Sequence, residues 1–190
     1  MNRRQSFALL AGLIALPAFA HSPYRQWAVF RQRFLLVTTT RDDKGSDDLG
    51  EEIARILLAQ LPASRAQVSR ARDWSVLASL LTTKQTELAV MARERSAALF
   101  NGQPPYQDFG PSPLRVIVET ERYRLVCRDD FPSHHAFLLS EALMQEKDTQ
   151  GFSILGDAAA IPAHPGAMAY LRGEPLPPAP ENEKEIRRAQ

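Results

Sequence analysis

Short apolar segments alternate with amphipathic segments along the first half of the chain. Arg33–Thr40, Ala66–Ala71 and Glu87–Ala92 are short and rich in apolar or β-branched residues, a pattern that predicts buried strands. The segments after them repeat apolar side chains at helical spacing. Regular alternation of strands and helices is typical of a parallel sheet with right-handed crossovers. The sequence therefore predicts an α/β fold, with helices on both faces of a mostly parallel sheet.

The starts and ends of the helices can be placed from capping residues. The charged segment Arg41–Gly50 is expected to form a loop, and Asp48 with Glu51 can form a capping box for the helix after it. Pro62 is expected to end that helix, and Asp73 is expected to be the N-cap of the next one. The apolar stripe of the first helix would consist of Leu49, Ile53, Ile56, Leu57 and Leu61.

The alternation changes after residue 102, beyond a proline-rich segment. Leu114–Glu119 and Tyr123–Asp129 both resemble strands, and only a few polar residues separate them. Such a short link fits an antiparallel pair and is too short for a crossover. Pro132 is expected to open a helix with Ala136, Leu139 and Leu143 on its inner face. Further on, Pro175–Pro180 has the composition of an extended, polyproline-like segment.

The first twenty residues have the three parts of a secretory signal. Arg3 and Arg4 form a positive region, Phe7–Leu16 is an apolar core, and Ala18–Ala20 precedes a cleavage position at His21. The core is shorter than the roughly 20 residues that span a bilayer. We expect a cleaved signal and a periplasmic protein; a retained membrane tether is the alternative. The paired arginines leave both the general secretory route and the twin-arginine route open.

Composition excludes several classes of function. Two of the 23 basic residues lie in the expected signal, so the remaining chain has 21 basic against 22 acidic residues. This balance argues against nucleic-acid binding, which needs an excess of positive charge. Cys127 is the only cysteine, so no internal disulfide can form, and a buried side chain is the expected state of its thiol. We also expect no stable membrane insertion of the mature chain.

No catalytic constellation is recognisable in the sequence. There is no glycine-rich phosphate loop and no nucleophile elbow. His134 and His135 are adjacent, so on a helix they point in different directions and cannot chelate one metal ion. The sequence therefore predicts a protein that is not an enzyme and has no metal or cofactor. His164 precedes Pro165 at the start of a short apolar segment, and we expect it to be a helix cap. Gly166, which has no side chain, would let another segment approach the helix closely.

Several segments resemble the TAXI solute receptors, which serve tripartite ATP-independent periplasmic (TRAP) transporters. HPGAMAYLRGE, residues 164–174, is similar to the C-terminal signature of that family. ELAVMARERSAALFNG, residues 87–102, is similar to its strand, helix and Asn-Gly turn. Asp47–Leu61 resembles its first helix, and residues 123–145 resemble the segment that returns to its first lobe.

The resemblance implies a single lobe of a periplasmic-binding-protein-like fold, mostly parallel and with one antiparallel strand. Family members have two lobes that enclose the ligand, whereas this chain passes almost directly from the third strand to the returning segment. Together with the residue patterns at the two ends, this gives a signal peptide over 1–20, one lobe over 21–174 and a proline-rich, charged tail over 175–190. Positions that bind ligand in the family have a different character here, while positions of its scaffold match.

Two functions follow as expectations. The first is a TAXI-like binding or accessory module, with a small carboxylate as ligand and TRAP membrane subunits or a second copy as partner. The second is a periplasmic interaction protein that has lost ligand binding and pairs with itself or with a partner through uncovered apolar surface. A ligand would lie at the carboxyl ends of the parallel strands. The residues expected there are Arg41, Lys44, Ser46, Arg72, Asp73, Trp74, Arg93 and Glu94.

Overall fold

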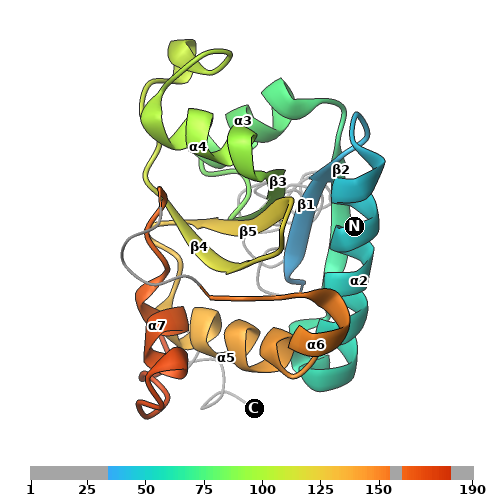
Figure 1. Ribbon diagram of the computed structural model, residues 1–190, viewed down its shortest axis with the longest axis vertical. Coiled ribbons are helices and arrows are strands. Elements are labelled where there is room, and N and C mark those ends of the chain that lie inside the picture. Colours follow the sequence, from blue (N-terminus) through green and yellow to red (C-terminus); the bar gives the residue numbers. More distant parts are fainter. Residues whose placement is uncertain (1–33, 155–159, 181–190) are drawn as a thin grey trace, which may run out of the picture. The chain divides into compact units, whose positions relative to one another are not determined.

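One mixed sheet of five strands lies at the centre of the computed structural model, which describes residues 34–154 and 160–180. The strand order is β2-β1-β3-β5-β4 (Figure 1). Strand β1 pairs in parallel with β2 and β3, whereas β5 pairs antiparallel with both β3 and β4. The expected α/β class, the antiparallel pair and the single antiparallel strand are confirmed. The strands are β1 (Leu36–Thr40), β2 (Gln67–Ala71), β3 (Leu88–Ala92), β4 (Leu114–Glu119) and β5 (Tyr123–Arg128).

Helices cover both faces of this sheet. Figure 1 shows α3 and α4 on one side of β5 and β4, and α5 and α7 on the other side. Helix α2 follows β1 and packs against β1, β2, β3 and α5. The helices are α2 (Lys44–Gln60), α3 (Trp74–Thr82), α4 (Arg93–Asn101), α5 (Ser133–Met144), α6 (Lys147–Gln150) and α7 (Pro165–Leu171), with short 3-10 turns η2 (Pro62–Ser64) and η3 (Gln107–Phe109).

The apolar side chains of the interior form two clusters, one on each face of the sheet. Successive strand residues point to opposite faces, so Leu125 joins one cluster and Val126 the other. The first cluster contains the inner faces of α2, α5 and α7, including Ala136, Leu139 and Leu143 as expected. The second contains those of α3 and α4. Cys127 is fully buried in the first cluster, and burial raises the pKa of its thiol.

The start of α2 differs from the sequence prediction. The helix begins at Lys44, inside the segment that was expected to be a loop, and its N-cap is Asp43. The Asp43 carboxylate accepts hydrogen bonds from the backbone N–H groups of Gly45 and Ser46, at 2.9 and 3.2 Å. The capping box expected at Asp48 is therefore wrong, because a better-placed carboxylate already holds the end of the helix. Asp48 lies one turn inside and pairs with Lys44 on the surface.

The C-terminal part of the described chain is fastened to α5 and β4. Ala163 forms a parallel bridge with Val116 of β4. Helix α7 begins two residues after Ala163. A Cβ atom on Gly166 would overlap the backbone of Ser133 at the start of α5, so the glycine permits the close approach that the sequence predicted. Beyond α7 the chain has no regular secondary structure up to Pro180, and the Pro177 carbonyl lies 2.7 Å from Nδ1 of His134.

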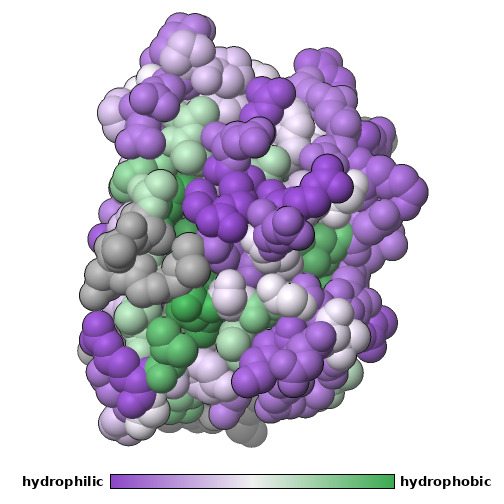
Figure 2. Space-filling view, in the orientation of Figure 1, coloured by the Kyte–Doolittle hydropathy of each residue, from purple (hydrophilic) through white to green (hydrophobic). Residues whose placement is uncertain are grey.

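The expectation of an uncovered apolar sheet face is wrong for the described residues. Both faces of the sheet are packed against helices, because each strand face supplies one of the two apolar clusters. On the side drawn in Figure 2, hydrophilic residues cover the middle and the right, and hydrophobic residues gather toward the left. Within residues 34–154 and 160–180, the exposed large hydrophobic side chains are those of Leu58, Leu171 and Leu176.

The expected signal segment (residues 1–20) and the charged end of the tail (181–190) lie outside the described residues. A compact unit begins at Phe34. None of the helices in the described part of the chain is both long enough and apolar enough to cross a membrane.

Candidate functional site

The carboxyl ends of β1, β2 and β3 lie next to one another, as expected for a ligand site. The backbone N–H of Arg41, just after β1, donates to the carbonyl of Ala71 at the end of β2. The chain leaves β1 toward α2 on one face and leaves β3 toward α4 on the other. In open α/β sheets, ligands bind in the crevice formed where adjacent strands diverge in this way. The candidate site is therefore the crevice between the ends of β1 and β3.

This crevice is filled by a side chain of the protein itself. Tyr123 begins β5 and pairs with Ala92, the last residue of β3, so its ring lies at the end of β3 under the start of α2. Its hydroxyl donates to Oδ1 of Asp43 at 2.8 Å. The tyrosine is 8% exposed. Burial, followed by the hydrogen bond to Asp43, raises the pKa of the Tyr123 hydroxyl.

Tyr123 packs closely against the first turn of α2. A Cβ atom on Gly45, in the first turn of α2, would overlap the Tyr123 hydroxyl oxygen. The positive end of the α2 dipole, which favours an anion, therefore faces Asp43 and the tyrosine hydroxyl. In other proteins such a helix end is available to bind an anionic ligand. Here the Asp43 carboxylate takes the place that a ligand's carboxylate would occupy.

Lys44 and Ser46 do not form a ligand-binding loop. Both belong to the first turn of α2. Ser46 is fully buried, and its hydroxyl donates to the Val90 carbonyl at 3.0 Å, which ties α2 to β3. Lys44 is exposed and pairs with Asp48 one turn along the helix. Ser46 is thus structural, and Lys44 lies on the outer surface.

The three residues expected after β2 make local contacts. The Arg72 side chain donates from Nε to Asp73 at 2.8 Å, and the Asp73 carboxylate caps α3 by accepting from the Val76 N–H at 2.8 Å. The pKa of Asp73 is lowered by the Val76 hydrogen bond and then by Arg72. Trp74 packs as a half-buried side chain against the second apolar cluster. Asp73 is therefore the helix cap that the sequence predicted, and Trp74 is mainly part of the core.

Arg93 takes part in a buried ion cluster that sequence reasoning missed. Its guanidinium lies 3.2 Å from Glu119 at the end of β4, and Glu119 also pairs with Arg124 of β5 at 2.9 Å. The side chains of Glu119 and Arg124 are only 2% and 5% exposed. Arg124 also donates to the carbonyl of Arg93 and to Oγ of Ser96, at 3.2 and 3.4 Å. The sequence contained an indication of this cluster, because Glu119 and Arg124 are charged residues within two strands that are otherwise mostly apolar.

Two of the eight expected residues remain available on the surface at this end of the sheet. Arg41 and Glu94 are exposed, and within the described ranges no hydrogen bond or ion pair of their side chains is present. They lie in separate segments, after β1 and in the first turn of α4. The structure thus brings the predicted residues to one end of the sheet, but commits most of them to capping, packing or ion pairing.

His164 is the cap of α7 and not an exposed catalytic base. Its Nδ1 accepts a hydrogen bond from the Gly166 N–H at 3.0 Å, and its Nε2 lies 2.8 Å from the carbonyl of Phe131. The side chain is 1% exposed. Burial lowers the pKa of the imidazole, and the hydrogen bond to Phe131 opposes this effect in part. Both ring nitrogens are used when the imidazole is neutral with its proton on Nε2.

The lowered pKa of His164 predicts a pH dependence of stability. The unfolded chain binds a proton at about pH 6.5, whereas the folded chain resists protonation to lower pH. The stability contributed by neutral His164 is therefore complete above pH 6.5 and is lost as the pH falls toward the folded pKa. Urea unfolding should show wild type more stable than His164→Asn by about 1–2 kcal/mol at pH 8, with a smaller difference at pH 5. A difference independent of pH would contradict this interpretation.

Comparison with known proteins does not assign the chain to a family. No protein-family model matches it, and no curated protein matches it either. In the described part of the chain, no group of three or more His, Cys, Asp and Glu side chains is arranged to hold a metal ion.

Proposed function

We propose that this chain is an exported, non-catalytic accessory module, similar to one lobe of the TAXI receptors, that acts by associating with another protein. The closed crevice carries this proposal. Tyr123 and Asp43 occupy the place between β1 and β3 where an open α/β sheet offers its ligand site. The partner is a TRAP membrane subunit or a second copy of the chain, and the compartment is the periplasm.

The TAXI-like part of the proposal is supported by positions of the scaffold. The HPGAMAYLRGE segment contains α7, and His164 and Gly166 are buried in contacts with Phe131 and Ser133. In a periplasmic-binding-protein-like lobe these contacts would join the returning segment to the C-terminal helix. Conversely, most of the positions expected to bind ligand cap helices, pack against the core or pair with neighbours, and within the described residues only Arg41 and Glu94 do none of these. A lobe that keeps its fold but no longer binds a ligand would keep the scaffold contacts and lose the ligand-binding positions in this way.

The alternative function is binding of a small solute at the carboxyl ends of the parallel strands. Arg41 and Arg72 are exposed, and each surface pair with a carboxylate contributes only about 0–1 kcal/mol. A micromolar site needs roughly 8 kcal/mol. Without a second lobe to exclude water, these contacts cannot reach that value.

Calorimetric titration with L-glutamate and succinate tests the proposal. We expect no saturable heat for the wild type, and no difference between wild type, Arg41→Gln and Arg72→Gln. Micromolar binding that either substitution abolishes would show that the strand ends do capture solutes, and the accessory function would have to be abandoned. Light scattering over a range of concentrations then distinguishes pairing with a second copy from pairing with another protein.

A further inference from the structure

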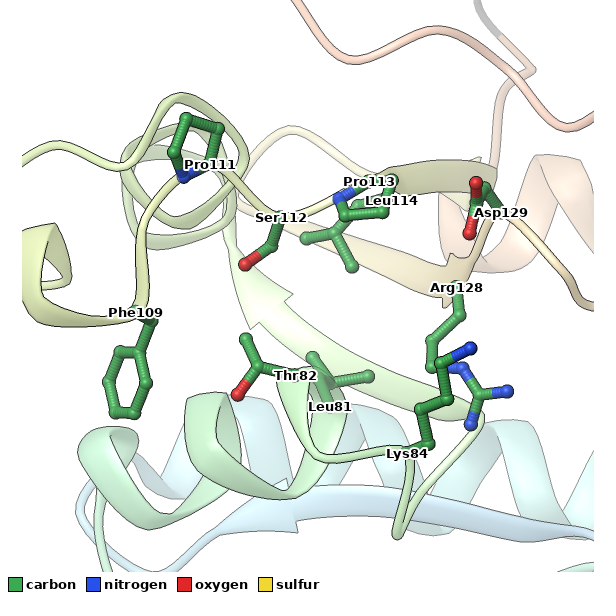
Figure 3. Close-up of a pocket in the computed structure, with 10 residues that line it drawn as sticks. All are labelled: Leu81, Thr82, Lys84, Phe109, Pro111, Ser112, Pro113, Leu114, Arg128 and Asp129. Carbon is green, nitrogen blue, oxygen red and sulfur yellow. The ribbon is translucent and has the colours of Figure 1, made fainter.

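The two edges of the sheet are covered differently. Strand β4 is bridged along its outer side by the chain itself, since Val116 lies beside Ala163 and Glu119 lies beside Ser153. Glu119 and Ser153 exchange both backbone hydrogen bonds, each 2.8 Å long. Figure 3 shows the segment 111–113, with a proline at each end, running directly into β4. Prolines lack a donor and help to prevent pairing at a strand edge, so the β4 edge is protected.

The outer edge of β2 is open in the part of the chain that the structure describes. The Gln67 N–H donates to the Leu35 carbonyl at 2.9 Å, and the Ala71 carbonyl accepts a backbone hydrogen bond of 3.0 Å from the residue after β1. Because the direction of these groups alternates along a strand, Val68 and Arg70 point their backbone N–H and C=O groups away from β1. No described residue hydrogen-bonds to those groups. Such a row of unpaired groups is a template for another strand.

The Arg70 side chain does not block this edge. A charged side chain on an edge strand often prevents pairing. Here the Arg70 guanidinium is directed toward α2, where it pairs with Asp47 at 2.8 Å and with Glu51. Val68 is partly buried and packs against the first apolar cluster, which includes the inner face of α2. Both residues therefore hold their side chains against α2 and leave the backbone edge accessible.

We propose that β2 pairs antiparallel with β2 of a second copy of this chain, with Ser69 on the two-fold axis, so that the two sheets become one. Val68 of each copy exchanges both backbone hydrogen bonds with Arg70 of the other. The strand is complementary to itself in this arrangement, and a small side chain lies at the centre of the pairing. The inference rests on the proposed function, because it specifies the second copy as the protein partner.

Charge favours this register over a neighbouring one. A two-fold axis at Arg70 would place Arg70 directly opposite itself, and like charges directly opposite are unfavourable. An axis at Ser69 places Val68 opposite Arg70 instead. It also brings Arg65, which is exposed just before β2, to the end of the second copy's strand where Asp73 follows it. Symmetry repeats this approach of basic and acidic residues on the other side of the axis.

An exposed apolar side chain of α2 lies toward the same edge. Leu58 follows Glu51 by about two helical turns and so lies on the side of α2 from which Glu51 reaches Arg70 of β2. Leu58 is 49% exposed. Helix α2 packs mainly over β1, so in the joined sheet the two α2 helices lie about three strand spacings, or about 14 Å, apart. Long side chains fill such a gap, and the pairing reduces the exposure of Leu58 in both copies.

Oxidative cross-linking at Ser69 tests the position of the axis. The two copies of Ser69 face each other at a non-hydrogen-bonded position, with Cα atoms about 4.5 Å apart, which a disulfide can join. Ser69→Cys should therefore give a covalent dimer under mild oxidation, seen on a non-reducing gel. Gln67→Cys is the matched control on the same face of the strand, and should give none because its two copies lie about 14 Å apart. Cys127 is fully buried and present in both variants.

A proline at Val68 tests the backbone hydrogen bonds. Val68→Pro removes an outward N–H and leaves the bonds to β1 in place, and proline is accepted at such an edge position. Light scattering should show a wild-type dimer and a dimer dissociation constant raised at least about tenfold in Val68→Pro. Val68→Ala shortens the side chain but keeps the N–H, and should change the constant less than about threefold. Circular dichroism checks that both variants fold.

Three results would overturn the pairing. A wild type that stays monomeric up to its solubility limit is the first. The second is a dimer that Val68→Pro leaves intact and that cross-links equally through Cys at 67 and at 69, which would leave association itself standing without β2. The third is slow amide exchange at Val68 and Arg70 in a dilute monomer, because another segment of the same chain would then cover the edge. Failure of the proposed function is a separate result, since it shows as succinate binding in calorimetry.

Discussion

Arg124→Met is expected to destabilise the protein by about 3–5 kcal/mol, the largest effect of any single substitution considered for this chain. Arg124 is 5% exposed and pairs with Glu119, which is 2% exposed. Removing the arginine leaves a buried carboxylate whose remaining partner is the half-exposed Arg93. Such a charge loses its hydration without regaining an equivalent interaction. Urea unfolding monitored by circular dichroism measures the change.

A double substitution distinguishes this explanation from a general packing defect. Glu119→Leu with Arg124→Met removes both buried charges, and Arg93 can then turn to water because it is partly exposed. We expect the double variant to be more stable than Arg124→Met by at least about 2 kcal/mol. Arg72→Met, at an 83% exposed arginine, is the matched control and should cost less than about 1 kcal/mol. A double variant as unstable as the single one would show that the cost comes from shape and not from charge.

Gly166→Ala is expected to destabilise the protein by about 2–3 kcal/mol. The added Cβ would overlap the Ser133 carbonyl oxygen and lie 3.0 Å from the Cβ of Ala136. The obstacle is backbone at the start of α5, which cannot turn aside as a flexible side chain would. Helices α5 and α7 must therefore separate, and both His164 hydrogen bonds lie beside that contact. Thermal unfolding and urea unfolding should agree on the loss.

Gly151→Ala is the control for the effect of glycine replacement itself. Gly151 has a φ of 66° and no atom within 4 Å of an added Cβ, so its replacement costs backbone strain without a steric clash. We expect a loss of about 1 kcal/mol there. Equal losses at Gly166 and Gly151 would mean that the α5–α7 contact is less tight than the structure has it.

The elements that the sequence predicted correctly depend on local patterns. Strands β3 and β4 follow from short apolar segments, and Asp73 and His164 are recognisable as caps from their neighbours in sequence. The start of α2 was missed because Asp43 and Asp48 both satisfy the local pattern of a cap. The choice between them involves Tyr123, which is 80 residues away.

The state of the candidate site depends on such long-range pairings and could not be predicted from spacing. The sequence placed Arg93 at the end of β3, but its pairing with Glu119 needs the register of β4 and β5. Likewise, Tyr123 reaches the crevice because β5 inserts between β3 and β4 and runs antiparallel to both. A sequence pattern gives the ends of strands, whereas strand order decides which side chains meet there.

The ionisation of Tyr123 tests most directly whether the crevice is closed. NMR of tyrosines labelled at Cζ, with Tyr123 assigned by comparison with Tyr123→Phe, gives its pKa in the folded protein. A buried hydroxyl bonded to Asp43 should ionise above the ordinary value of about 10, and a large molar excess of succinate should leave its signal unchanged. An ordinary pKa with a solvent-exposed ring, or a signal that moves as succinate binds, would show that the crevice is open and would contradict the account.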